Sequence, residues 1–221
     1  MKKITLLLLL LCATTIATSQ QLYIEGGKTM SSFEYKNSQG NKLENLQATS
    51  HSFMTMGYRK PVLFDKMYAS LGASYAGYGA IGSTDAVGNF MEWDVNYLEV
   101  NVGADYEFYT YKNFTFYAKT ALSLEFFLQG VQTLNNRVID LKNSDFDKAS
   151  LDFRTGLGFS HPISENLSFY AQYVHSKTFD SASGNEKLRI KSNNISFGLL
   201  IDLDKATKEP INETENTPNN L

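Results

Sequence analysis

Polar and apolar residues alternate along most of the chain, in stretches of roughly eight to fourteen residues. The clearest stretch has one face made of Leu98, Val100, Val102, Ala104, Tyr106 and Phe108. Its other face is made of Glu99, Asn101, Gly103, Asp105 and Glu107. Successive side chains of a strand point to opposite sides, so this stretch predicts a strand whose two faces lie in different surroundings.

The same alternation returns at seven further places, and the intervening segments differ in length. The further stretches are residues 22–27, 54–60, 67–75, 114–126, 151–160, 167–173 and 195–201. Segments 32–50, 77–92 and 128–148 read as long connections, 181–187 as an intermediate one, and 61–66, 109–113 and 161–166 as short ones. About eight strands with long and short connections in turn are typical of small barrels that keep long loops outside and short turns in the periplasm. The pattern predicts an all-β fold: a single closed antiparallel up-and-down transmembrane β-barrel.

The first nineteen residues predict a secretory signal peptide. Lys2 and Lys3 precede an apolar run over 4–11, and Ala17-Thr18-Ser19 has the small-x-small form of a cleavage site, so the mature chain is expected to begin at Gln20. Cleavage there would remove two lysines and move the net charge from -3 to -5. A lipoprotein anchor on Cys12 is the alternative, but Leu11 stands where such signals carry a small residue.

The division of the chain follows from this leader and from the composition of the other end. We expect a signal peptide over 1–19, a barrel over 20–203, and a disordered polar tail over 204–221. No apolar stretch after the leader is long enough for a transmembrane helix. Export then leaves a membrane barrel or a secreted soluble protein, and only a closed barrel lets strands span lipid with every backbone group paired.

Composition narrows the possible chemistry. Only 4 of the 221 residues are proline and 13% are aromatic, which suits long regular strands. A net charge of -3 gives no reason to expect a nucleic-acid partner. The 3 histidines are far apart in sequence and the 1 cysteine lies in the leader, so we expect no metal site, no disulfide and no cofactor.

If the apolar faces meet lipid, the charged faces point into the barrel. That arrangement predicts an interior charge network made of Glu25, Arg59, Glu99, Asp105, Glu107, Lys119, Glu125, Asp152 and Arg154. An eight-stranded barrel is only wide enough for side chains to fill, so buried charges need partners. We expect Arg59, Lys119 and Arg154 to neutralise some of the carboxylates. A structural plug is favoured over a small gated pore, because open channels need about sixteen strands.

Two other functions start from the same residues. A soluble lipocalin-like binding barrel would have an apolar interior and a polar exterior, which the many carboxylates of the charged faces disfavour. A lipid-modifying enzyme at the outer rim would bring His51 or His175 close to a serine and an aspartate, with Ser52, Ser176 and Asp180 the nearest in sequence. Nothing in the spacing requires that site, and His161 before Pro162 is interpreted as a turn residue. The expectation is a non-enzymatic protein.

Aromatic residues gather around the short turn at 109–113. They are Tyr106, Phe108, Tyr109, Tyr111, Phe114 and Phe116. Aromatic side chains form belts where a membrane barrel meets water, so this group predicts an interfacial girdle.

Three segments carry a resemblance to a known group of proteins. Segment 96–106, Asn-Tyr-Leu-Glu-Val-Asn-Val-Gly-Ala-Asp-Tyr, resembles the fourth-strand region of small porin-like, OmpA/OmpX-like outer-membrane barrels. Met56-Gly57-Tyr58-Arg59 before a turn resembles their second strand, and segment 194–203 resembles the closing strand that the barrel-assembly machinery reads. The resemblance implies a bacterial outer-membrane location with lipid and the assembly machinery as partners. It also implies a role in envelope integrity, in surface interaction through the long loops, or in limited passage of small solutes.

Overall fold

The computed structural model describes residues 20–36, 39, 46–62, 64–84, 89–179 and 187–203. The expected signal peptide and the expected polar tail lie outside the described residues. No helix among the described residues is long and apolar enough to cross a membrane.

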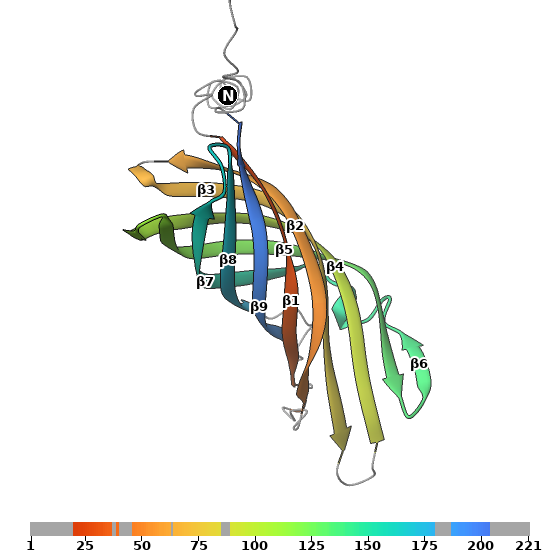
Figure 1. Cartoon of the computed structure of the whole chain (residues 1–221). Helices are drawn as coiled ribbons and strands as arrows, with labels where there is room; N and C mark the ends of the chain where they lie inside the picture. Colours follow the sequence, from red (N-terminus) through yellow and green to blue (C-terminus); the bar gives the residue numbers. More distant parts are fainter. Residues whose placement is uncertain are drawn as a thin grey trace, which may run out of the picture.

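Nine antiparallel strands and one short helix make up the described chain. They are β1 (Gln21–Lys36), β2 (Gln47–Val62), β3 (Phe64–Thr84), β4 (Asn89–Tyr111), β5 (Phe114–Leu134), β6 (Arg137–Asp140), the 3₁₀ helix η1 (Asp145–Asp147), β7 (Ser150–Pro162), β8 (Leu167–Thr178) and β9 (Lys187–Asp202). Strands that follow each other in sequence pair, except β6 and β7; β1 also pairs with β9, and β5 pairs with β4, β6 and β7. The pairings close all strands except β6 into a ring, which confirms the predicted eight-stranded up-and-down barrel (Figure 1).

The wall of the barrel is apolar outside and polar inside over the part nearest the short turns. On β9, Ile195 and Phe197 are 51% and 57% exposed, whereas Ser196 between them is 1% exposed. Leu98, Val100 and Val102 on β4 are likewise exposed, and the polar residues between them face the interior. A soluble lipocalin-like barrel would show the reverse arrangement, so the inside–outside assignment made from the alternation is confirmed.

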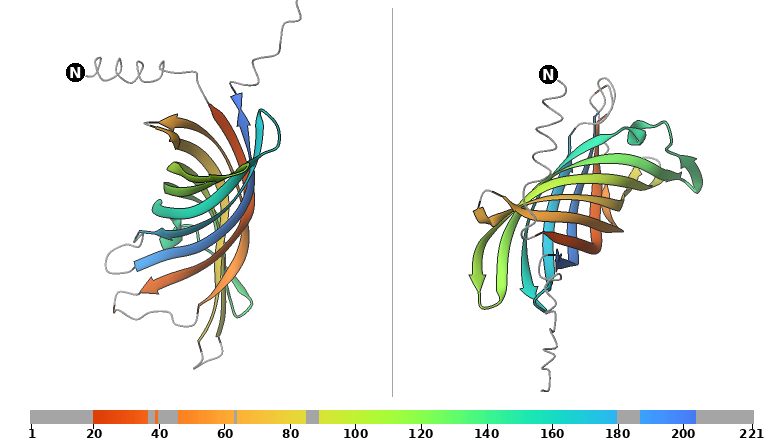
Figure 2. Two further views of the ribbon diagram at one scale, coloured as in Figure 1. Left: turned by 60° about the vertical axis from the view of Figure 1, so that its left-hand side comes forward. Right: turned by 90° about the horizontal axis from the view of Figure 1, so that it is seen from above.

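The two ends of the barrel differ in how far the strands extend. β2 and β3, β4 and β5, and β7 and β8 are joined by short turns at the end where β1 begins and β9 ends. At the opposite end β3, β4 and β5 are the longest strands, and the β3–β4 and β5–β6 hairpins project beyond the rest (Figures 1 and 2). The end with the projecting hairpins is called the mouth below.

The prediction of a long glycine-rich loop over 77–92 was wrong, because β3 runs to Thr84 and β4 begins at Asn89. Glycine in this segment marks a close approach between neighbouring strands. A Cβ atom on Gly79 would lie 2.4 Å from the His51 ring and 2.4 Å from the Trp93 carbonyl oxygen. Only glycine leaves the space that this strand pairing needs.

The other long connections predicted at the mouth were also too long. β1 reaches Lys36 and β2 starts at Gln47, while the segment predicted as a loop over 128–148 contains the end of β5, β6 and η1. At the mouth ends of β1, β4 and β9 the inward side chains are mostly apolar, as at Phe33, and the outward ones are polar, as at Glu34. The alternation is therefore inverted, and the expected apolar outer face is missing from the sequence pattern.

Two apolar clusters lie inside the barrel at different heights. The cluster at the mouth contains Phe33, Ala76, Tyr78, Ala80, Trp93, Val95, Tyr97, Leu141, Leu188 and Ile190. A smaller cluster near the short turns contains Tyr23, Tyr117, Tyr170 and Leu200. The charged residues of the interior lie near and between these clusters, where contact with bulk water is limited.

Candidate functional site

The interior charges form two clusters, and the one nearer the mouth is called the upper cluster. It consists of Glu99, Glu125, Asp152 and Arg154, which come from β4, β5 and β7. The Arg154 guanidinium lies 2.9 Å from Glu99 Oε1 and 3.7 Å from Glu125 Oε1, and its Nε donates to Asp152 Oδ2 at 2.7 Å. Tyr78 of β3 donates its hydroxyl proton to Glu99 Oε1 at 2.5 Å and accepts from Arg154 at 3.1 Å. The guanidinium of Arg154 thus connects side chains from four neighbouring strands, β3, β4, β5 and β7.

The lower cluster consists of Arg59, Asp105, Glu107 and Lys119, and it lies closer to the short turns. Arg59 Nη1 is 3.6 Å from Asp105 Oδ2, and Arg59 Nη2 is 3.8 Å from Glu107 Oε1. Lys119 Nζ lies 3.4 Å from the other oxygen of Asp105. The guanidinium of Arg59 also stacks over the ring of Tyr68 at 4.4 Å. Here two basic side chains form ion pairs with two carboxylates, so the charges of the lower cluster balance.

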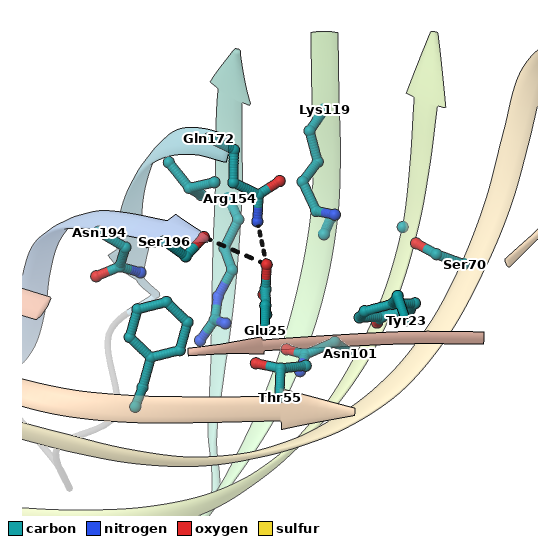
Figure 3. Close-up of a pocket in the computed structure, with 14 residues that line it drawn as sticks. Tyr23, Glu25, Thr55, Ser70, Asn101, Lys119, Arg154, Gln172, Asn194 and Ser196 are labelled. Carbon is teal, nitrogen blue, oxygen red and sulfur yellow. Dashed lines mark hydrogen bonds between the residues drawn. The ribbon is translucent and has the colours of Figure 1, made fainter. Parts of the chain in front are cut away.

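Glu25 has no basic partner among the ion pairs of the described residues and is held by neutral donors instead. Tyr170 and Gln172 donate to Glu25 Oε2 at 3.0 and 2.6 Å, and Ser196 donates at 3.3 Å. Figure 3 shows the bonds from Gln172 and Ser196 converging on this carboxylate. Several hydrogen bonds to one carboxylate oxygen offset part of the free energy lost on removing the charge from water.

The upper cluster carries more carboxylates than bases. Three carboxyl groups face the one guanidinium, and Glu99 Oε2, Glu125 Oε1 and Asp152 Oδ1 are buried without a hydrogen-bond partner. An unpaired buried polar atom is destabilising by about 1–3 kcal/mol. The guanidinium of Arg154 is therefore the group on which the upper cluster depends.

Little empty space remains between the two clusters. A cavity of about 30 Å³ lies beside Glu25, Lys119 and Arg154 (Figure 3), and one of about 10 Å³ lies beside Arg59 and Tyr117. The larger has room for roughly two water molecules, since one needs about 10–15 Å³. The described side chains thus fill most of the barrel at this level, as expected for a barrel of this width.

All nine residues proposed from the sequence face the interior of the structure. The upper and lower clusters account for eight of them, and Glu25 lies apart with its neutral donors. The predicted site residues did not include the polar partners Tyr78, Tyr170 and Gln172, which alternate on the same faces as the charges. Counting polar aromatic and amide residues on those faces would have identified the two on β8.

Within the described part of the chain, no histidine is brought together with a serine and an aspartate as the rim site would require. His51 Nε2 is 3.7 Å from Asp94 and its Nδ1 is 3.4 Å from Thr49, while Ser52 accepts a hydrogen bond from Lys28. The 3.4 Å between the Thr49 hydroxyl and the His51 ring is longer than the usual distance between a nucleophile and its base, about 2.6–3.2 Å.

His175 and Ser176 lie on opposite sides of β8. His175 is exposed and bonds Asn193 at 3.0 Å, whereas Ser176 is buried and bonds Ser192 at 2.7 Å. Asp180 lies outside the described residues. His161, which was interpreted as a turn residue, instead pairs with Phe169 within the β7–β8 ladder.

The remaining features of the wall concern metals and aromatic residues. Among the described residues, no three histidine, cysteine, aspartate or glutamate side chains are arranged to hold a metal ion. Tyr106, Phe108, Tyr109 and Tyr111 are all about half exposed on the outer wall and turn, and Phe114 is 40% exposed. This exposure is compatible with the interfacial girdle expected there.

Comparison with known protein families gives one match that covers most of the chain. Residues 4–201 match the family described as outer membrane protein beta-barrel domain. No curated protein sequence matches the chain.

Several solved structures resemble the barrel. OprG from Pseudomonas aeruginosa, an outer membrane protein, aligns with a TM-score of 0.51 and 13% identity over 83% of this chain and 97% of its own. Neisserial surface protein A gives 0.47 and 13% over 82% and 96%, and the outer membrane protease OmpT from Escherichia coli gives 0.47 and 7% over 86% and 99%. At these identities the likeness to OprG shows the fold alone.

Proposed function

The chain belongs to the outer membrane protein beta-barrel domain family, and from that premise we propose that it is a closed, non-conducting barrel with no enzymatic activity. It is a bacterial outer-membrane protein with transmembrane strands. The exposed apolar side chains of the wall therefore face lipid, and the interior charges are shielded from it.

The observation that carries this proposal is the filled interior. Arg154 and its three carboxylates occupy the interior nearer the mouth, Arg59 and Lys119 pair with carboxylates nearer the short turns, and the cavity between them is about 30 Å³. A hydrated ion would have to displace paired charges to pass. The network accordingly acts as a plug that also fixes the positions of the strands.

The part available for interaction is the mouth with its projecting hairpins. The β3–β4 and β5–β6 hairpins extend beyond the shorter strands and carry polar outward residues such as Glu92 and Asp94. Function on a shared barrel fold resides in such projecting segments, so a surface-interaction role fits better than transport. The barrel-assembly machinery remains the expected partner during insertion, through the apolar outer face of β9.

Planar-bilayer recording of the refolded protein tests the closed interior. We expect no unitary conductance steps from the wild type, with folding verified by the heat-dependent mobility of the barrel on SDS gels. A Lys119→Ala, Gln172→Ala double variant removes two side chains that line the central cavity and should begin to conduct. Regular conductance steps from the folded wild type would overturn the proposal.

A further inference from the structure

An apolar cavity of about 270 Å³ lies inside the mouth. Aromatic side chains from three elements line it: Phe33 and Tyr35 of β1, Trp93 of β4 and Phe146 of η1. Leu46 lies beside them in the lining of the cavity. The cavity is partly open to solvent, so it is an accessible site and not a sealed void of the packed core.

The segment between β6 and β7 folds over one side of this cavity. Phe146 packs edge-on against Phe33 with ring centroids 5.1 Å apart, and its carbonyl accepts a hydrogen bond from Tyr97 at 3.0 Å. Ser144 donates to the Leu141 carbonyl and accepts from the Phe146 amide, which fixes the turn. The cap is therefore attached to the wall by its own contacts, and the cavity remains beneath it.

Two buried tyrosines, called the floor below, lie between the lining of the cavity and the polar interior. Tyr78 and Tyr97 are not lining residues but deeper members of the same apolar cluster, with ring centroids 5.9 Å apart, and the hydroxyl of Tyr78 belongs to the upper cluster. The cavities beneath that level are small and polar. A ligand entering from the mouth would stop at this floor, so the space suits a compact molecule and not an extended chain.

The lining also restricts the charge of a ligand. Asp145, the one charged side chain among the described residues of the lining, is paired with Lys148. Gln132 contributes an amide, which can both donate and accept a hydrogen bond. An added charge would lose its hydration among aromatic rings without gaining a countercharge, whereas one hydroxyl group would find a partner.

We propose that the mouth cavity binds a small uncharged aromatic molecule carrying a hydroxyl or similar group. The ring lies among Phe33, Trp93 and Phe146, and its polar group bonds Gln132. An apolar cavity of about 150 Å³ accommodates benzene, so this one accommodates a ligand on the order of ten non-hydrogen atoms. The site is distinct from the interior network and requires no passage through the barrel.

Trp93 provides a direct readout, because it is the one tryptophan of the chain and it lines the cavity. We would titrate the folded barrel with 6-bromo-2-naphthol, whose bromine quenches tryptophan emission on contact. The site predicts saturable quenching by this probe. The anion 6-bromo-2-naphthoate should bind roughly tenfold more weakly or worse, because its charge is not compensated.

Two leucine-to-phenylalanine variants give a matched pair. Leu46→Phe fills the cavity and should weaken quenching by roughly tenfold or more, while Leu122→Phe, on the lipid-facing wall, should leave it unchanged. Gln132→Leu should weaken binding of the bromonaphthol but not of bromonaphthalene, which keeps the test valid if Leu46→Phe fails to fold. Absent quenching, or equal and non-saturating quenching in all variants, would overturn the proposal.

Discussion

The barrel wall at the upper cluster and the barrel wall at the mouth use opposite polarity patterns on the same strands. On β4, Glu99 faces inward and Leu98 outward at the level of the cluster, whereas Trp93 faces inward and Asp94 outward at the mouth. The inward parity of the strand does not change between them. What changes is the medium outside the barrel, which is lipid at the level of the upper cluster and water at the mouth.

The same inversion occurs on β9, so it is not confined to one strand. Near the short turns Ile195 faces outward and Ser196 inward, while at the mouth Arg189 faces outward and Ile190 inward. Each level places apolar side chains away from water, in lipid or in the interior. The membrane level must consequently stabilise its interior with ion pairs, and the mouth can stabilise its interior with a conventional apolar core.

The largest expected effect comes from removing the base of the upper cluster. Arg154→Ala leaves Glu99, Glu125 and Asp152 without their guanidinium, and breaking such a buried pair is destabilising by about 3–5 kcal/mol. Urea unfolding in lipid vesicles would measure the loss. Arg137→Ala on exposed β6 is the control and should change stability by less than about 0.5 kcal/mol. Equal stability of the two variants would refute an essential role for the network.

At the mouth the corresponding change is Phe33→Ala. Phe33 is 5% exposed and packs against Trp93 and Phe146, so its loss should lower the unfolding free energy by about 3 kcal/mol. The substitution should also shift Trp93 emission, because a neighbouring ring is removed. Ile163→Ala, at an exposed turn, serves as the comparison. A loss no larger than that of the comparison would show that the mouth has no cohesive apolar core.

A smaller effect is expected in the lower cluster. Lys119→Met removes one of two bases near Asp105, and Arg59 remains at 3.6 Å to compensate the carboxylate. The expected destabilisation is about 1–3 kcal/mol, below that of Arg154→Ala, in the same unfolding experiment. If Lys119→Met were the more damaging substitution, the two clusters would have to exchange their assigned importance.

The smallest effect is expected when the excess of carboxylates is reduced. Glu125→Gln keeps an acceptor for the Ser150 hydroxyl, which bonds Glu125 Oε2 at 2.6 Å, and removes one of three like charges around Arg154. Stability should change by less than about 1 kcal/mol in either direction. A loss as large as that of Arg154→Ala would mean that all three carboxylates are required as anions.

The sequence predicted the membrane level much better than the mouth, and the inversion explains why. Alternation with an apolar outer face identified residues such as Glu99 and Arg154 as inward before their partners were known. It did not indicate which strands bring them together, because pairing depends on the register of the ring. At the mouth, Phe33 lies in a segment that was predicted as a loop and Trp93 directly follows another, since their strands have polar outer faces and β3 contains close-packed glycines such as Gly79.

The central claim is that a closed polar interior lies beneath an accessible apolar mouth, and cysteine labelling tests it most directly. A chain starting at Gln20 has no cysteine, so single cysteines can be placed at Gln132, which lines the mouth cavity, and at Ser123, which is fully buried in β5 below Glu125. With a membrane-impermeant thiol reagent added from the mouth side, Gln132→Cys should react and Ser123→Cys should not until the barrel is unfolded. Comparable reaction rates at both positions in the folded barrel would contradict the account and indicate an open lumen.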